Sequence, residues 1–236
     1  MKVRIAYIEE PPFYWTAEDG SVVGSDIELA QVVLEAIGAT SIEYHPTAFE
    51  ALLPGVDEGR WDMNVPIFIS AERERRVAFS RPVWALSDGF LLPAGNPKAL
   101  SGYASLAAQS DARLGVIAGT VQIEAATSAG VSDSQIVVFR DQPAAIAALL
   151  AGEIDAFVGT AVGNRALARV HPGLETVAHE KRRNGRMPFG GFSFGKDNHG
   201  LLEAVNEQLR RYLGSYDHRV RMAKYGITQA EIDGIL

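Results

Sequence analysis

The sequence predicts an α/β protein of two lobes, each built on a mixed, mostly parallel sheet flanked by helices. Segments with strand periodicity alternate with segments of helix periodicity from the start of the chain, which is typical of parallel strands joined by crossover helices. The alternation forms two series, and each is too short for one large sheet. The chain has 236 residues and is 47% hydrophobic, so it can bury two cores.

The first series begins with a strand at residues 4–8, and the prolines that follow it end that strand. A helix is expected to begin at a cap formed by Ser25 or Asp26 and to end at Gly38, because apolar residues between them recur on one face. The remaining elements are a strand at 41–45, a helix at 49–58, a buried strand at 61–69 and a short strand at 76–79.

The second series follows an extended segment at residues 88–93. Its expected helices are at 101–108, 121–129, 143–152 and 160–170, and its expected strands at 113–117, 135–139 and 156–158. A second extended segment at 190–195 precedes a helix at 200–213, for which Asp197 is the expected cap. No repeat or low-complexity tether separates the series, so we expect the two extended segments to connect the lobes.

Composition excludes several classes of function. The net charge is −7 and no stripe of Lys and Arg is present, so binding of nucleic acid is not expected. The absence of cysteine excludes disulfides, thiolate metal sites and thiol nucleophiles. No apolar run is long enough to span a bilayer. The first strand starts close to Met1, so the protein is either cytoplasmic or an exported protein without its export segment.

The sequence gives no support for an enzyme, a cofactor or a metal site. Residues 191–195 (GFSFG) fit the formal pattern of a nucleophile elbow, but three residues intervene before the next helix and too little chain follows for the required strands. His171, His179 and His199 lack metal-ligand spacing and are expected on the surface. The glycines form no dinucleotide or phosphate fingerprint.

Several motifs along the chain are similar to the sequence signatures of one known protein family. Residues 23–30 (VGSDIELA) are similar to the family signature G-[FY]-D-[VI]-[DE]-[LM]-A, with Ser25 at the usual aromatic. The most specific match joins 71–73 (AER) to 79–82 (FSRP). Further similarity lies at 49–54 with 59–62, at 118–120, at 152–156 and at 202–225. Over nearly its whole length the chain therefore resembles the polar-amino-acid (family 3) solute-binding proteins of ABC importers.

The resemblance implies a type II periplasmic-binding-protein clamshell. Its first lobe would comprise residues 1–90 and 193–236, and its second lobe residues 91–192. It implies a periplasmic, non-enzymatic monomer, with its export signal removed, that closes by a hinge over a small zwitterion and delivers it to the permease of an ABC importer. The alternatives on the same fold are a lyase similar to cyclohexadienyl dehydratase and the ligand-sensing module of a receptor.

Two positions are the expected anchors for a ligand carboxylate. In the family motif, Arg73 stands at a strand-to-turn junction, where its planar fork of donors matches a carboxylate. In the second lobe, Thr120 and the main-chain amides of Val121 and Gln122 open a helix, and helix N-termini favour anions.

The departures from the family pattern point away from a plain α-amino acid. Pro66 and Phe68 stand where these proteins commonly carry a glycine and a ligand-binding threonine. Thr160 stands where they usually carry the aspartate that binds the ligand's ammonium group. Because burial of an uncompensated ammonium is costly, another carboxylate must take over this role, and Glu10 is the candidate.

The set of ligand-binding candidates is similar to that of the ectoine-binding branch of the family, which encloses a cyclic amidinium carboxylate. Three aromatic side chains are expected to offer their faces to a delocalised cation: Phe13, Phe49 and Phe68. Trp15 and Trp84 are further candidates. We therefore expect an ectoine-like or betaine-like ligand.

Overall fold

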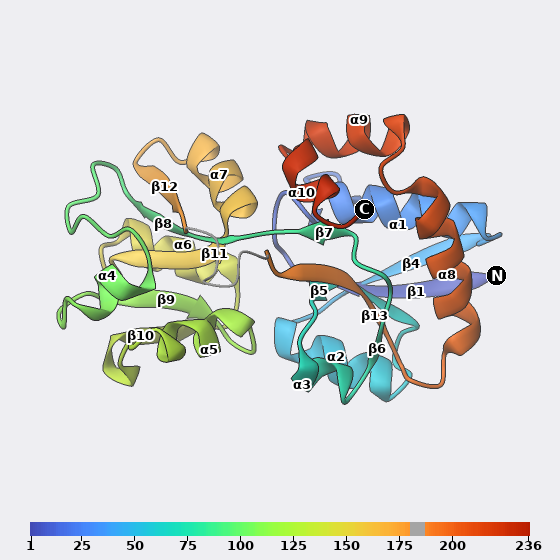
Figure 1. The fold of residues 1–236 in the computed structure, drawn as a ribbon, viewed down its shortest axis with the longest axis horizontal. Helices are drawn as coiled ribbons and strands as arrows, with labels where there is room; N and C mark the ends of the chain where they lie inside the picture. Colours follow the sequence, from blue (N-terminus) through green and yellow to red (C-terminus); the bar gives the residue numbers. More distant parts are fainter. Residues whose placement is uncertain (180–186) are drawn as a thin grey trace. The chain divides into compact units, whose positions relative to one another are not determined.

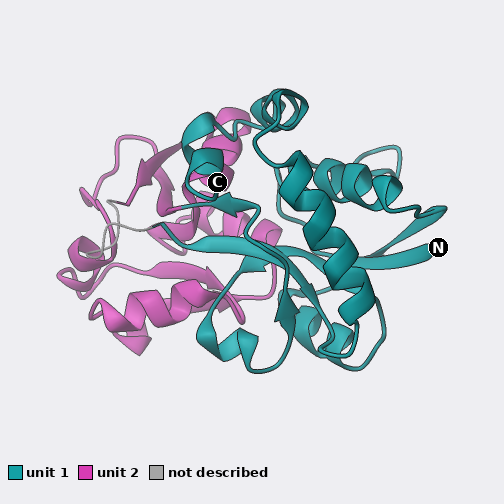
Figure 2. Ribbon diagram, turned by 45° about the vertical axis from the view of Figure 1, so that its right-hand side comes forward, with its two compact units in different colours: residues 1–86, 187–236 teal, residues 87–186 magenta. Residues whose placement is uncertain are grey.

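A computed structural model describes residues 1–179 and 187–236 of the chain. The described chain divides into two compact units (Figure 2). Unit 1 comprises Met1–Leu86 and Met187–Leu236, and unit 2 comprises Ser87–Arg186. The sequence placed the divisions at 90/91 and 192/193 because it treated two extended segments as connections. In the structure each of these segments is a strand inside one sheet, so the divisions precede them.

Unit 1 is built on a mixed sheet with the strand order β4-β1-β5-β13-β6, and β7 also pairs with β13 (Figure 1). The strands β1, β4 and β5 are parallel, whereas β13 runs antiparallel to its neighbours. The strands are β1 (Lys2–Tyr7), β4 (Ser41–Pro46), β5 (Met63–Phe68), β6 (Ala78–Phe79), β7 (Trp84–Ala85) and β13 (Phe189–Phe194). A separate two-stranded ribbon pairs β2 (Trp15–Thr16) with β3 (Val22–Val23).

The helices of unit 1 are α1 (Ser25–Ala36), α2 (Phe49–Asp57), α3 (Ala71–Glu74), α8 (His199–Tyr212), α9 (Tyr216–Lys224) and α10 (Gln229–Asp233). The connection β1-α1-β4 and the connection β4-α2-β5 run in opposite directions across the sheet, so right-handed crossovers place α1 and α2 on opposite faces. The face under α2 contains a core cluster that includes Leu52, Trp61 and Ile67.

Unit 2 is built on a sheet of strand order β10-β9-β11-β8-β12 (Figure 1). Its strands are β8 (Asp88–Pro93), β9 (Leu114–Ile117), β10 (Ile136–Phe139), β11 (Ala156–Thr160) and β12 (Leu174–Ala178). Its helices are α4 (Tyr103–Ala107), α5 (Val121–Ser128), α6 (Gln142–Leu150) and α7 (Ala161–Val170), with a 3-10 turn at Asp133–Gln135. Strands β9, β10 and β11 are parallel, and β8 runs antiparallel to β11 and β12.

Strand β8, an inner strand of the unit 2 sheet, is apolar on both sides because helices cover both faces of the sheet. On β8, Phe90 and Leu92 belong to the core cluster that contains residues of α4 and α5, whereas Leu91 belongs to the cluster that contains residues of α6 and α7. Successive strand residues point to opposite faces, which explains this alternation. The sequence predicted the bounds of this strand but not its place between β11 and β12.

Two expected helix caps are wrong. Helix α1 is preceded by Gly24, and no side chain caps it, because the Asp26 carboxyl binds a tryptophan instead. Helix α8 begins at His199 after Asn198, not after Asp197. His179 is also not a free surface residue, since its ring packs edge-on against Phe90 at 4.4 Å between centroids. Burial of this imidazole lowers its pKa to about 4.

Candidate functional site

The topology of each sheet indicates where a ligand would bind. In open α/β sheets, ligands bind beyond the carboxyl ends of the strands, at the point where successive connections leave in opposite directions. In unit 1 this switch point lies between β1 and β5, and in unit 2 it lies between β9 and β11. Each predicted binding residue lies in a segment that adjoins one of these two points or packs beside it.

In unit 1, a tight turn after β1 holds Glu10. The Glu10 amide donates to the carbonyl of Tyr14 at 2.8 Å, and the Glu10 carbonyl accepts from the amide of Phe13 at 3.0 Å. The Tyr14 hydroxyl donates to Glu10 Oε2 at 3.1 Å. Burial of the carboxyl group raises the pKa of Glu10 to about 7, and the Tyr14 hydrogen bond opposes this rise. A cation beside this carboxyl group would favour its ionised form.

Arg73 follows β5 in the short helix α3, where the Ser70 hydroxyl accepts from the Arg73 amide at 3.3 Å. The residue is 7% exposed, and its Nη1 donates to the Phe68 carbonyl at 2.7 Å. The guanidinium carbon lies 5.1 Å from the centroid of the Phe49 ring, in cation–π contact. Burial lowers the pKa of Arg73 to about 10, so the side chain stays charged at neutral pH. These contacts fix a buried cation at the switch point.

Three aromatic rings pack together beside Glu10. Trp84 stands edge-on to Phe68 with 5.2 Å between centroids, and it is tilted against Phe13 at 6.2 Å. Gly190 underlies the tryptophan, because a Cβ at this position would lie 1.9 Å from Trp84 Cη2. The sequence placed Trp84 among its secondary candidates, and the structure places it at the centre of this aromatic cluster. Trp15 lies elsewhere and packs edge-on against Tyr225.

Asp26 is a second carboxyl group in this half-site. The sequence predicted a different role for it, as the cap of a helix. It is fully buried, and its Oδ2 accepts from Trp84 Nε1 at 3.1 Å while its Oδ1 accepts from the Ser25 hydroxyl at 3.2 Å. Burial raises the pKa of Asp26 to about 7, and the neighbouring Glu10 charge adds to the rise. Unit 1 thus brings the fully buried carboxyl group of Asp26 and the half-buried Glu10 together with the buried guanidinium group of Arg73.

In unit 2, the loop after β9 leads into α5. Thr120 precedes this helix, and its hydroxyl donates to the Ile117 carbonyl at 2.8 Å rather than capping the helix. The amides of Val121 and Gln122 open α5, and the first amides of a helix have no acceptor within the helix itself. This geometry suits an anion.

Thr160 ends β11 on the other side of the same switch point. It is 6% exposed, and its hydroxyl accepts from the Gly163 amide at 3.0 Å, so it caps α7. Asn164, one turn into α7, donates to the Gly89 carbonyl at 2.8 Å. The Thr160 side chain therefore stabilises the start of α7.

The sequence also missed Asp88 and Tyr103, which lie beside the predicted residues Gln122 and Thr160. Asp88 begins β8 and pairs directly with Thr160 on β11. It is 8% exposed, and its Oδ1 accepts from Gln122 Nε2 at 2.9 Å while its Oδ2 accepts from the Tyr103 hydroxyl at 3.0 Å. The local sequence gave no signal, because only strand pairing brings this acid to the carboxyl end of β11.

The structure therefore brings the predicted candidates together in two sets. Unit 1 gathers Glu10, Phe13, Phe49, Phe68 and Arg73 near the β1/β5 switch point. Unit 2 places Thr120, Val121, Gln122 and Thr160 at the β9/β11 switch point. Within the described residues, no group of His, Asp and Glu could hold a metal ion, and no helix is both long and apolar enough to cross a membrane.

Two α/β units, each with polar groups at its switch point, define the class of two-unit solute-binding proteins with the type II periplasmic-binding-protein fold. The family model of the bacterial extracellular solute-binding proteins, family 3, matches residues 3–226. The chain therefore belongs to this family.

Individual relatives and similar structures are described as proteins that bind small solutes. The chain is 28% identical over 240 residues to a probable amino-acid ABC transporter periplasmic-binding protein, y4tE, of Sinorhizobium fredii, with 99% of this chain and 79% of that protein covered. It is 27% identical to the L-cystine-binding protein TcyJ of Escherichia coli, over 84% of this chain and 72% of that protein. The crystal structure of EhuB in complex with hydroxyectoine is similar with a TM-score of 0.86 and 26% identity, covering 96% of this chain and 89% of that one.

Proposed function

We propose that this protein is the periplasmic solute-binding subunit of an ABC importer and that it captures a compact cationic zwitterion of the ectoine or betaine type. Both half-sites contact one ligand molecule in this proposal, and hinge closure of the two units follows binding. The protein then acts as a monomer that delivers its ligand to a membrane permease. The names of its relatives support the importer role, and the similarity to EhuB supports the ligand class.

The observation that carries the proposal is the composition of the half-site in unit 1. A buried Arg73 offers donors to a carboxylate, while Glu10 and the rings of Phe13 and Phe68 suit a delocalised cation. These groups have the complementary charges that a zwitterion requires. In unit 2, the N-terminus of α5 is a second site for the carboxylate.

A thermal-shift and calorimetry panel tests this function. Hydroxyectoine, glycine betaine, L-glutamine, L-cystine and L-arginine serve as probes, and we expect hydroxyectoine or glycine betaine to bind tightest. A ligand at a hundred times its Kd adds roughly 2.7 kcal/mol of stability. For a chain of this size the melting temperature should rise by about 5 to 10 °C. Tightest binding of glutamine or cystine would contradict the proposed ligand class.

Small-angle scattering tests the closing step. A ligand that binds the closed form better than the open form shifts the population toward closure, so saturating ligand should reduce the radius of gyration. A ligand that raises the melting temperature but leaves the radius unchanged would indicate a rigid, preformed pocket instead. The same measurement gives the particle mass and therefore tests the monomer.

A lyase on the same fold is the second candidate, and Glu10 is the observation that favours it. A carboxyl group with a pKa near 7 has the properties of a general acid at neutral pH. Mass spectrometry of the ligand before and after prolonged incubation separates the two functions. A binding protein returns the ligand unchanged, whereas a lyase converts it.

A further inference from the structure

The half-site in unit 2 lacks an acidic residue at the position where one was expected, because Thr160 occupies that position. Neither the loop after β9, which leads into α5, nor the turn from β11 into α7 contains an acidic residue. Thr160 ends β11, and its hydroxyl already caps α7. These two segments therefore offer donors for a carboxylate but no negative charge for a cation.

An acid reaches this switch point from the neighbouring strand. Because β8 runs antiparallel to β11, its first residue lies at the carboxyl end of β11, and Asp88 is paired with Thr160. Compared with the position of Thr160 on β11, the acidic side chain therefore lies one strand away, on β8, and this half-site still contains a carboxyl group. Asp88 is 8% exposed, so solvent screens its charge far less than it screens that of a surface acid.

Two neutral donors orient this carboxyl group. Gln122 Nε2 donates to one oxygen and the Tyr103 hydroxyl donates to the other. Since a carboxylate only accepts hydrogen bonds, it turns the NH₂ group of Gln122 toward itself, and the Gln122 carbonyl oxygen is left as an acceptor for other groups. The first turn of α5 therefore presents amide donors together with an oriented side-chain acceptor.

We propose that Asp88, oriented by Gln122 and Tyr103, supplies the negative charge by which unit 2 selects a cationic ligand. This inference rests on the proposed function, because it assumes that the ligand binds at the β9/β11 switch point. Its specific content is the choice between charged and neutral ligands of the same shape. Asp88 is therefore a specificity-determining residue, and its effect is on discrimination rather than on the fold.

Matched ligand pairs test this role. Glycine betaine and 3,3-dimethylbutyrate share their shape and carboxylate but differ in the cation, and L-arginine and L-citrulline are a second such pair. Removing one partner of a desolvated charge pair leaves the other charge unpaired, so Asp88→Asn should weaken binding of the cationic member at least about thirtyfold. Binding of the neutral member should change less than about threefold. Asp88→Glu, which keeps the charge, should restore most of the discrimination.

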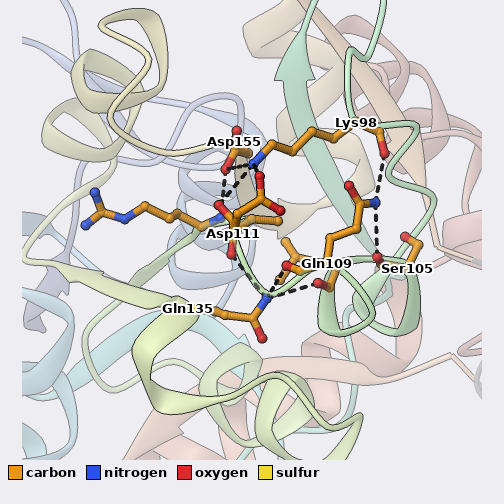
Figure 3. Close-up of polar contacts among 9 residues, drawn as sticks. Lys98, Ser105, Gln109, Asp111, Gln135 and Asp155 are labelled. Carbon is orange, nitrogen blue, oxygen red and sulfur yellow. Dashed lines mark hydrogen bonds and ion pairs between the residues drawn. The ribbon is translucent and has the colours of Figure 1, made fainter.

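A carboxylate at the opposite edge of the same sheet provides the control. Asp155 precedes β11 and accepts from Lys98 Nζ at 3.1 Å and from the Arg113 amide at 2.8 Å, within the polar network that joins Lys98, Asp111 and Asp155 (Figure 3). Thr160 lies five residues further along the extended chain, which corresponds to about 16 Å. This distance exceeds the Debye length of about 8 Å at physiological salt. Asp155→Asn should therefore lower the melting temperature and leave the discrimination unchanged.

The outcomes separate this inference from the proposed function. If Asp88→Asn weakens both members of a pair equally, the role of Asp88 is structural and the inference is overturned. If L-arginine binds tightest, the proposed ligand class is wrong, and the arginine and citrulline pair still decides the role of Asp88. If no probe binds the wild-type protein, both the proposed ligand class and the inference fail. Should Asp88→Asn not fold, Asp88→Ser serves as the second neutral variant.

Discussion

Replacement of Arg73 by alanine tests the half-site in unit 1. The side chain is 7% exposed, its guanidinium group is held by the Phe68 carbonyl and the Phe49 ring, and burial lowers its pKa to about 10. A ligand carboxylate that meets this group is therefore paired with a desolvated cation in a fixed geometry. The variant leaves that carboxylate without its partner.

The expected loss follows from this burial. Removing one partner of a desolvated, hydrogen-bonded charge pair costs about 2 to 5 kcal/mol of binding. At 25 °C this corresponds to an increase in Kd of roughly 30-fold to several thousand-fold. Arg73→Lys keeps the charge but loses the planar fork, so its loss should be intermediate. The free protein should still fold, because deleting Arg73 also removes the cost of burying its charge.

Isothermal titration calorimetry with hydroxyectoine or glycine betaine measures this loss, and circular dichroism checks the fold. Arg75 is the matched control, because it lies in the same short segment and is exposed. Arg75→Ala should change Kd by less than about threefold, as expected for an exposed charge. A folded Arg73→Ala protein with the Kd of the wild type would remove Arg73 from the binding site.

Three further predictions concern the buried acids and one close packing contact. Because burial raises the pKa of Glu10 and Asp26 to about 7, the folded protein holds protons that the unfolded chain releases above about pH 4. The free energy of unfolding should therefore fall as pH rises from about 4 to 7, and Asp26→Asn should reduce this slope in thermal melts; an unchanged slope would place the effect elsewhere. A bound cation favours the ionised form of Glu10, so the affinity for glycine betaine should rise between about pH 5.5 and 8. Binding should also release protons, which calorimetry in two buffers of different ionisation enthalpy measures. An affinity that does not depend on pH would contradict this prediction. Gly190→Ala places a methyl group against Trp84 and should cost about 1 to 3 kcal/mol in denaturant unfolding, whereas Gly200→Ala, which meets no atom within 4 Å, should not; equal stabilities would refute the packing argument.

The agreement between the predicted and observed fold has a physical basis. Hydrophobic periodicity depends on residues a few positions apart, so the sequence predicted most strands and helices to within a few residues. The alternation of strands with helices then predicted mixed, mostly parallel sheets, and both sheets have this form. The short strands β6, β7 and β12 depend on their neighbours in the sheet, and the sequence predicted them poorly or not at all.

Local sequence was a poor guide to the role of Asp26. Asp26 stands where a helix cap is expected, yet its carboxyl group accepts from Trp84, a residue distant in sequence. Burial of both groups and the position of β7 determine this contact. A capping pattern describes only the backbone nearby, so it could not show that a stronger partner was available.

The sequence by itself determined the fold class, the family and the first-choice carboxylate anchor, because each depends on periodicity or on a motif of adjacent residues. Tertiary structure alone decided that Trp84 completes the aromatic cluster with Phe13 and Phe68 and that Asp88 lies opposite Thr160. Strand register and side-chain packing join residues that are far apart in the chain. They also remove charged groups from water, and this burial gives the acids of unit 1 their raised pKa values.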